Sequence, residues 1–191
     1  MSDEHTVDPA VGPVDRQWLD QVSPWLNVGD PSAITVLPRR IVNGKAIYDD
    51  DVGPLVKWLR SEGFDARFLD TPDQTFESHY GAVSDILLAV LVNIGSNAAW
   101  DGFKSLLSKI RYRARDTKSA GIEPQCKVFL GLVKYPDDSS LMWQEISGSA
   151  EEVLDFAESI IRDYIAGNAG GANAEIEENA HPDQPSQDVP E

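Results

Sequence analysis

The sequence is poor in the residues from which catalytic and metal sites are usually built. It has one cysteine, Cys126, so neither an intrachain disulfide nor a multi-cysteine metal site can form. Of its three histidines, His5 and His181 lie near the ends and only His79 lies centrally. It also lacks the motifs GxxxxGK[ST], GxGxxG, HExxH and GxSxG, which mark nucleotide-binding, metalloprotease and serine-hydrolase sites. We therefore expect no enzyme activity, no cofactor and no metal.

Long apolar segments are lacking as well. The longest unbroken apolar run covers residues 86–92, whereas a membrane-spanning helix needs about 20 residues. The first five residues, MSDEH, lack the basic and apolar regions of a secretory signal. Together with the single cysteine, these features predict a cytoplasmic protein.

Basic residues are lacking at both ends of the chain. The formal net charge is -16, but residues 1–15 hold four acids and residues 167–191 hold six, with no Lys or Arg in either segment. This leaves 22 acids against 16 bases in between. We expect residues 1–13 to be disordered, residues 14–166 to form a single globular domain, and residues 167–191 to be a disordered acidic tail.

The stretch from residue 80 to residue 115 is the most informative part of the sequence. Residues 86–92 are all apolar, so a helix here is hydrophobic on every side and must be buried. From Ala99 to Ile110 apolar residues recur at helical spacing, as in a half-exposed helix. The small residues 95–99 between the two halves mark a tight contact or a kink, so residues 80–112 form one helix or two.

The other elements follow from turn and capping signals. The dipeptide Asn43-Gly44 indicates a tight hairpin, and Ser149 with Glu152 forms a capping box that starts the last helix. Trp18 and Trp25 are expected to anchor the N-terminal segment. These signals predict an α/β (α+β) fold, a mixed β-sheet with a C-terminal β-hairpin, packed against a long central helix and two shorter helices. The expected elements are strands at 33–37, 64–69, 126–134 and 141–146, a hairpin at 41–48, a helix that starts within the aspartates 49–51 and runs to about 62, and a helix at 149–164.

Basic residues gather where the long helix ends. Five of them are the candidate interaction patch: Lys109, Arg111, Arg113, Arg115 and Lys118. Cations in the last helical turn complement the helix dipole, but this effect does not account for the cations beyond it. The cations beyond the last helical turn have four explanations. They bind nucleic acid, anionic lipid or an acidic protein segment such as the chain's own tail, or they form a plain solvated face. The overall acidity disfavours nucleic acid.

In element order and apolar pattern the chain resembles the effector-associated constant component family of bacteria. The resemblance covers residues 33–147. It rests on the helix segment LVKWLR at 55–60, the strand ARFL at 66–69, the segment GAVSDILLAV at 81–90, the basic helix end at 111–115 and the hairpin at 128–146. Members are small proteins encoded beside effector genes in conflict systems. The resemblance implies a non-enzymatic accessory role with a protein partner.

The leading hypothesis is a non-enzymatic interaction or accessory module with an unidentified protein partner. One alternative is a peripheral protein that binds an anionic membrane surface through a helix at 86–115. A second is a metal-dependent hydrolase, because clustered carboxylates suit Mg²⁺ or Ca²⁺ and a histidine near carboxylates can act as a general base. The residues available for that chemistry are Asp49, Asp50, Asp51, Asp70, Glu77 and His79. Capping is the simpler role for the three consecutive aspartates, and an inert buried thiol is the simpler role for Cys126.

Overall fold

The computed structural model describes residues 9–27, 32–77, 86–95, 97–119, 121, 124–134 and 138–166. They form two mixed sheets with helices, a mixed α+β fold. The larger sheet has the strand order β1-β9-β8-β7-β2-β5, and the smaller has the order β3-β4-β6. In chain order the elements are β1 (Ala10–Gly12), α1 (Arg16–Val22), η1 (Ser23–Trp25), β2 (Ile34–Val36), β3 (Arg40–Val42), β4 (Lys45–Asp49), α2 (Val52–Ser61), β5 (Ala66–Phe68), β6 (Asp73–Glu77), β7 (Ile86–Asn93), α3 (Asn97–Ser119), β8 (Gln125–Lys134), β9 (Asp138–Ser149) and α4 (Ala150–Ile165).

Residues 86–93 form strand β7, so the predicted helix at 86–92 is wrong. β7 pairs in parallel with β8 along its whole length and antiparallel with β2 at residues 90–92. A central strand buried on both faces has an unbroken apolar sequence, and so does a buried helix. A run of seven residues is long enough for the strand but short for the helix. The expectation that residues 80–112 form one helix or two is therefore wrong, because among the described residues of this stretch 86–93 are a strand and the helix α3 begins at Asn97.

Two further strands differ from expectation. β6 was not predicted, and it pairs in parallel with β4, from Lys45 with Asp73 to Asp49 with Glu77. β1 lies inside the segment 1–13 that was expected to be disordered, and its Val11 pairs antiparallel with Ile146 of β9. The disorder prediction is therefore wrong for Ala10–Gly12. Residues 1–8 and the predicted tail 167–191 lie outside the described residues.

The predicted α+β architecture and both hairpins are confirmed. At the first hairpin Asn43 and Gly44 have φ angles of 53° and 77°, the left-handed conformation that a two-residue hairpin turn requires. β8 and β9 form the second hairpin, α4 begins directly after Ser149, and α2 begins directly after the three aspartates. The capping prediction for these aspartates is wrong, because Asp51 makes no side-chain capping bond and the first turn of α2 holds no acid. The capping box at α4 is wrong in its detail. The Ser149 hydroxyl bonds to the Glu152 carboxylate, and neither caps a backbone amide.

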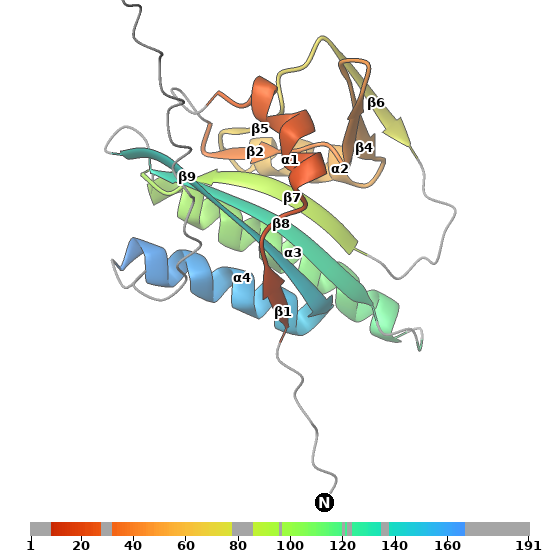
Figure 1. Cartoon of the computed structure of the whole chain (residues 1–191). Coiled ribbons are helices and arrows are strands. Elements are labelled where there is room, and N and C mark those ends of the chain that lie inside the picture. Colours follow the sequence, from red (N-terminus) through yellow and green to blue (C-terminus); the bar gives the residue numbers. More distant parts are fainter. Residues whose placement is uncertain are drawn as a thin grey trace, which may run out of the picture.

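Helices cover one face of the long strands and the N-terminal segment covers the other. In Figure 1, α3 and α4 lie along the same side of β7, β8 and β9, and α1 lies across the opposite side. On the α1 side, the ring of Trp18 lies 4.8 Å from that of Phe129 and 5.7 Å from that of Trp143, measured between ring centroids. Its indole N–H donates to the Pro38 carbonyl at 3.0 Å. Trp18 is thus the anchor that the sequence predicts, and Trp25 packs beside the same cluster.

The close approach of Trp143 to the backbone of β8 generates a stability prediction. A Cβ added at Gly131 would lie 2.6 Å from the Trp143 ring, which also contacts the Trp18 ring edge-on. We expect Gly131→Ala to destabilise the protein by about 1–3 kcal/mol, as overpacking of a core does. The matched control is Gly12→Ala, where an added Cβ meets nothing within 4 Å. Thermal unfolding measures both, and equal melting temperatures would contradict this packing.

Candidate functional site

A cleft of about 400 Å³ opens where the start of α2, the start of β7 and the C-terminal half of α3 meet. Its floor and walls are mostly aliphatic. Among the large hydrophobic side chains that line it, Tyr112 is the most exposed, at 73%. The lining residues are Asp51, Val52, Pro54, Leu55, Ile86, Leu87, Leu88, Lys109, Ile110, Tyr112, Arg113 and Asp116. We call this feature the α2–α3 cleft.

Helical periodicity explains which residues of α3 reach the cleft. Lys109, Arg113 and Asp116 follow one another at spacings of four and three residues, so they lie on one side of the helix. The Arg113 guanidinium donates to the carboxylate of Asp51, which is the residue before α2 begins. This ion pair joins the two helices beside the cleft. Lys109 is also engaged, because its ammonium lies 5.6 Å from the centre of the Trp58 ring, within cation–π range.

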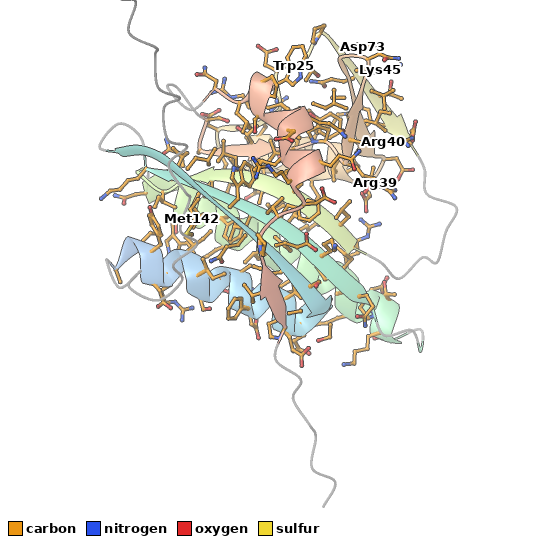
Figure 2. All side chains as sticks on the ribbon, in the orientation of Figure 1. Trp25, Arg39, Arg40, Lys45, Asp73 and Met142 are labelled. Atoms are coloured by element: carbon orange, nitrogen blue, oxygen red, sulfur yellow. The ribbon has the colours of Figure 1, made fainter. Side chains whose placement is uncertain are left out.

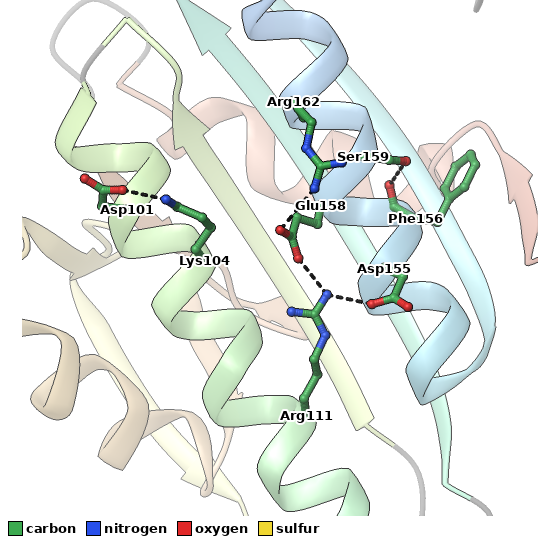
Figure 3. A network of polar contacts seen from close by, with 8 residues as sticks. All are labelled: Asp101, Lys104, Arg111, Asp155, Phe156, Glu158, Ser159 and Arg162. Atoms are coloured by element: carbon green, nitrogen blue, oxygen red, sulfur yellow. Dashed lines mark hydrogen bonds and ion pairs between the residues drawn. The ribbon is translucent and has the colours of Figure 1, made fainter.

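Arg111 faces the other way, toward α4. One of its terminal nitrogens donates to Asp155 and to Glu158, each at 2.8 Å (Figure 3). Arg162 adds a third contact, at 3.3 Å from the Glu158 carboxylate. The hydrogen bond from Arg111, together with the charges of both arginines, lowers the pKa of Glu158, and burial opposes this effect only in part. Arg111 therefore joins α4 to α3, and we call its contacts with Asp155 and Glu158 the Arg111 clip.

Arg115 and Lys118 also lie on the α4 side, around a hollow of about 20 Å³ that includes Glu151. The structure thus divides the five cations of the predicted patch between two sides of α3. Lys109 and Arg113 line the cleft, while Arg111, Arg115 and Lys118 face α4 or the hollow beside it. Of these five residues, Arg111, Arg113 and Lys109 have the partners described above.

The acidic residues considered for metal or hydrolytic chemistry are dispersed. Asp49 lies 3.7 Å from Arg39, Asp50 donates its backbone N–H to the Glu77 carbonyl, and Asp51 bonds to Arg113. Figure 2 shows Arg39 together with Arg40 at this end of the smaller sheet, where Arg40 pairs with Glu77 at 3.0 Å. Asp70 follows β5, and His79 is outside the described residues. Within the described ranges, no three His, Cys, Asp or Glu side chains are grouped as metal ligands would be.

The membrane hypothesis depended on a continuous helix at 86–115, which the structure does not contain. Its apolar half is strand β7, in the middle of the sheet, and its amphipathic half is α3, whose apolar side is buried against the sheet. None of the helices in the described part of the chain is both long and apolar enough to cross a bilayer.

Comparison with known proteins identifies no relative. No family model matches the chain, and neither a curated protein nor a solved structure shows a significant match.

The α2–α3 cleft was not predicted from the sequence, because its lining comes from three separate segments and one of them was assigned to a helix. One signal was available. Tyr112 lies within the predicted basic helix end and outside the apolar spacing of Ala99 to Ile110, so it had to project from the helix on its exposed side. A large exposed aromatic residue next to cations is typical of interaction surfaces.

The inert-thiol prediction for Cys126 gives a chemical test. Burial within β8 raises the pKa of this thiol to about 12, so almost no thiolate is present at pH 8. We expect the native protein to react with Ellman's reagent at least about a hundredfold more slowly than the protein in guanidinium, because each pKa unit removes tenfold of thiolate. Equal rates in the two states would show that Cys126 is accessible and reactive.

The Arg111 clip gives a pH-dependent stability prediction. A carboxylate whose pKa is lowered by folding stabilises the protein above its ordinary pKa of about 4.3, and this contribution is lost as the pH falls through the lowered value. Arg111→Gln should therefore cost about 1 kcal/mol at pH 7 and progressively less below pH 4, once Glu158 is protonated. Denaturant unfolding at several pH values measures the difference.

Lys104→Gln is the matched control for this experiment. Lys104 lies on the same helix and pairs with Asp101 at 2.8 Å, but both of these side chains are more exposed than those of Arg111 and Glu158 (Figure 3). An exposed pair three residues apart contributes little, so this variant should unfold nearly as the parent does at every pH. A cost for Arg111→Gln that stays constant from pH 7 to pH 3 would show that the Glu158 carboxylate is not its cause.

Proposed function

We propose that the chain is a non-enzymatic interaction module that binds a protein partner through the α2–α3 cleft. The observation that carries this proposal is the cleft itself, whose aliphatic walls of Val52, Leu55 and Ile110 lie beside an exposed Tyr112. Apolar side chains that line a concave surface gain free energy when a partner's apolar side chain displaces water from them. The accessory role is the one that the family resemblance implies.

The polar groups of the cleft fit binding better than catalysis. Among the described residues that line it there is no serine, threonine, cysteine or histidine, the commonest nucleophiles and general base. Arg113 is engaged by Asp51, and Lys109 lies over Trp58. A charged side chain that is held in an ion pair or a cation–π contact is suited to positioning a partner and to rejecting other proteins. It is less suited to transferring protons.

The location that we propose for this module is the reducing cytoplasm. The single cysteine is buried in β8 and forms no disulfide. Cysteines of cytosolic proteins are usually in this reduced, unpaired state. The acids at the two ends of the sequence add to the net charge of -16 and favour solubility there.

The proposal predicts that Tyr112→Ala weakens partner binding without unfolding the protein. Tyr112 is 73% exposed, so its removal costs the fold little, whereas an aromatic anchor at an interface often contributes 2 kcal/mol or more, about thirtyfold in affinity. The measurement is affinity capture from host-cell lysate, followed by titration of the captured protein. The matched control is Ile165→Ala, an exposed apolar residue on α4.

Two results would overturn the proposed function. One is a captured partner that binds the Tyr112→Ala variant as tightly as the parent, because its surface then lies elsewhere. The other is turnover of a nucleotide, nucleic acid or peptide by the purified protein that a substitution in the cleft abolishes, since the cleft would then be an active site.

A further inference from the structure

The edge of β7 that faces β2 is only partly paired. β2 is three residues long and covers β7 at residues 90–92, and one more bond, from the Leu37 N–H to the Ala89 carbonyl at 2.8 Å, continues the ladder. At the other end the Asn93 N–H donates to the Ala33 carbonyl. Residues 89, 91 and 93 thus direct their backbone groups toward β2. By the two-residue period of a strand, Leu87 directs its N–H and carbonyl to the same edge.

The chain leaves this edge at Pro38. If β2 continued, Arg39 would lie opposite Leu87 in the same register. Instead, the Arg39 N–H donates to the Ile47 carbonyl of β4 at 2.9 Å, so the chain has already crossed into the smaller sheet. Pro38 lies at this change of direction, and its carbonyl accepts a hydrogen bond from the indole N–H of Trp18. Across the described ranges, no backbone group takes the place opposite Leu87.

The open edge leads into the α2–α3 cleft. Ile86 and Leu88 pack on the helix side of the sheet and Leu87 packs on the other side, yet all three consecutive residues line the cleft. Successive side chains of a strand point to opposite faces, so a cavity that touches three in a row runs along the strand's edge. Within the part of the chain that the structure describes, the cleft therefore offers both an apolar wall and, at Leu87, a backbone donor and acceptor that no strand pairs.

We propose that the occupant of the cleft is an extended peptide segment of the partner, which adds to the sheet beside Leu87 in the place that β2 vacates. One peptide residue exchanges backbone hydrogen bonds with Leu87, and the residues that flank it point to the helix side, toward Val52, Leu55 and Ile110. Those flanking residues are aliphatic, with valine and isoleucine preferred because they suit a strand. The segment has the pattern apolar, any residue, apolar.

This inference rests on the proposed function, because it names the partner segment for the same cleft. An apolar helix or a small lipophilic molecule could fill the aliphatic wall equally well, but neither has a backbone donor and acceptor to offer an open strand edge. The free edge at Leu87 is what selects an extended peptide among them.

The first experiment is amide hydrogen exchange of the full chain, followed residue by residue by NMR. The Leu87 amide should exchange on the order of a hundredfold faster than the Leu91 amide, because Leu91 pairs with Thr35 in the middle of the sheet. Equal protection of the two amides in the free protein would show that the edge is already filled, which overturns the inference but leaves the proposed function standing.

The second experiment uses heptapeptides selected from a random library on the full chain. Peptides that bind the parent and the Ile165→Ala variant, but not the Tyr112→Ala variant, are taken forward. A single N-methyl group that removes the N–H facing Leu87 should weaken binding about tenfold, whereas the same group one residue along should not. Binding should also slow exchange at Leu87.

Three results would overturn the inference. In one, N-methylation is harmless at every position. In another, the selected peptides repeat their apolar residues at spacings of three and four, which identifies a helical partner. In the third, Leu87 exchange is unchanged by a peptide that needs Tyr112. If a captured protein also binds the Tyr112→Ala variant fully, it is the proposed function that fails.

Discussion

The need to cover both faces of β7 organises the rest of the structure. Its eight residues carry no charge, and the four from Ala89 to Val92 are at most 5% exposed. Burying one such aliphatic side chain gains about 1.5–3 kcal/mol, so an uncovered face would be costly. One face receives α2 and α3, with α4 beyond them under β8 and β9. The other receives α1, whose Trp18 fills the space above Phe129 and Trp143.

The same strand shows what the sequence could and could not predict. The hairpin at Asn43-Gly44, α2, α4 and the β8–β9 pair each have local signals, and all four are found. A run of seven apolar residues has no such signal, because burial on all sides removes the periodicity that separates a strand from a helix. β6 was missed for a related reason. Its segment, DQTFE, has a single large apolar residue, and it becomes a strand through pairing with β4.

The basic cluster shows why proximity in sequence does not establish a surface. Five cations within ten residues suggest one patch, but an α-helix turns by about 100° per residue and separates them. Arg113 is drawn to Asp51 on one side, and Arg111 to Asp155 and Glu158 on the other. A middle region with 22 acids and 16 bases supplies partners on every side, so most of these cations tie helices together. The sequence shows the cluster of cations but not its division between two sides of α3.

The cleft and the open edge have a common cause in the switch of the chain from one sheet to the other. The pairing with β7 ends at Leu37, Trp18 binds the carbonyl of Pro38, and Arg39 begins the pairing with β4. Because β2 stops there, the first residues of β7 lose a neighbour, and α2 and α3 approach that gap from one side of the sheet. A β2 extended by three residues, to Arg39, would pair with Leu87 and fill the cleft's backbone edge. The fold thus leaves in one place an apolar wall and the hydrogen-bonding groups that an added strand would use.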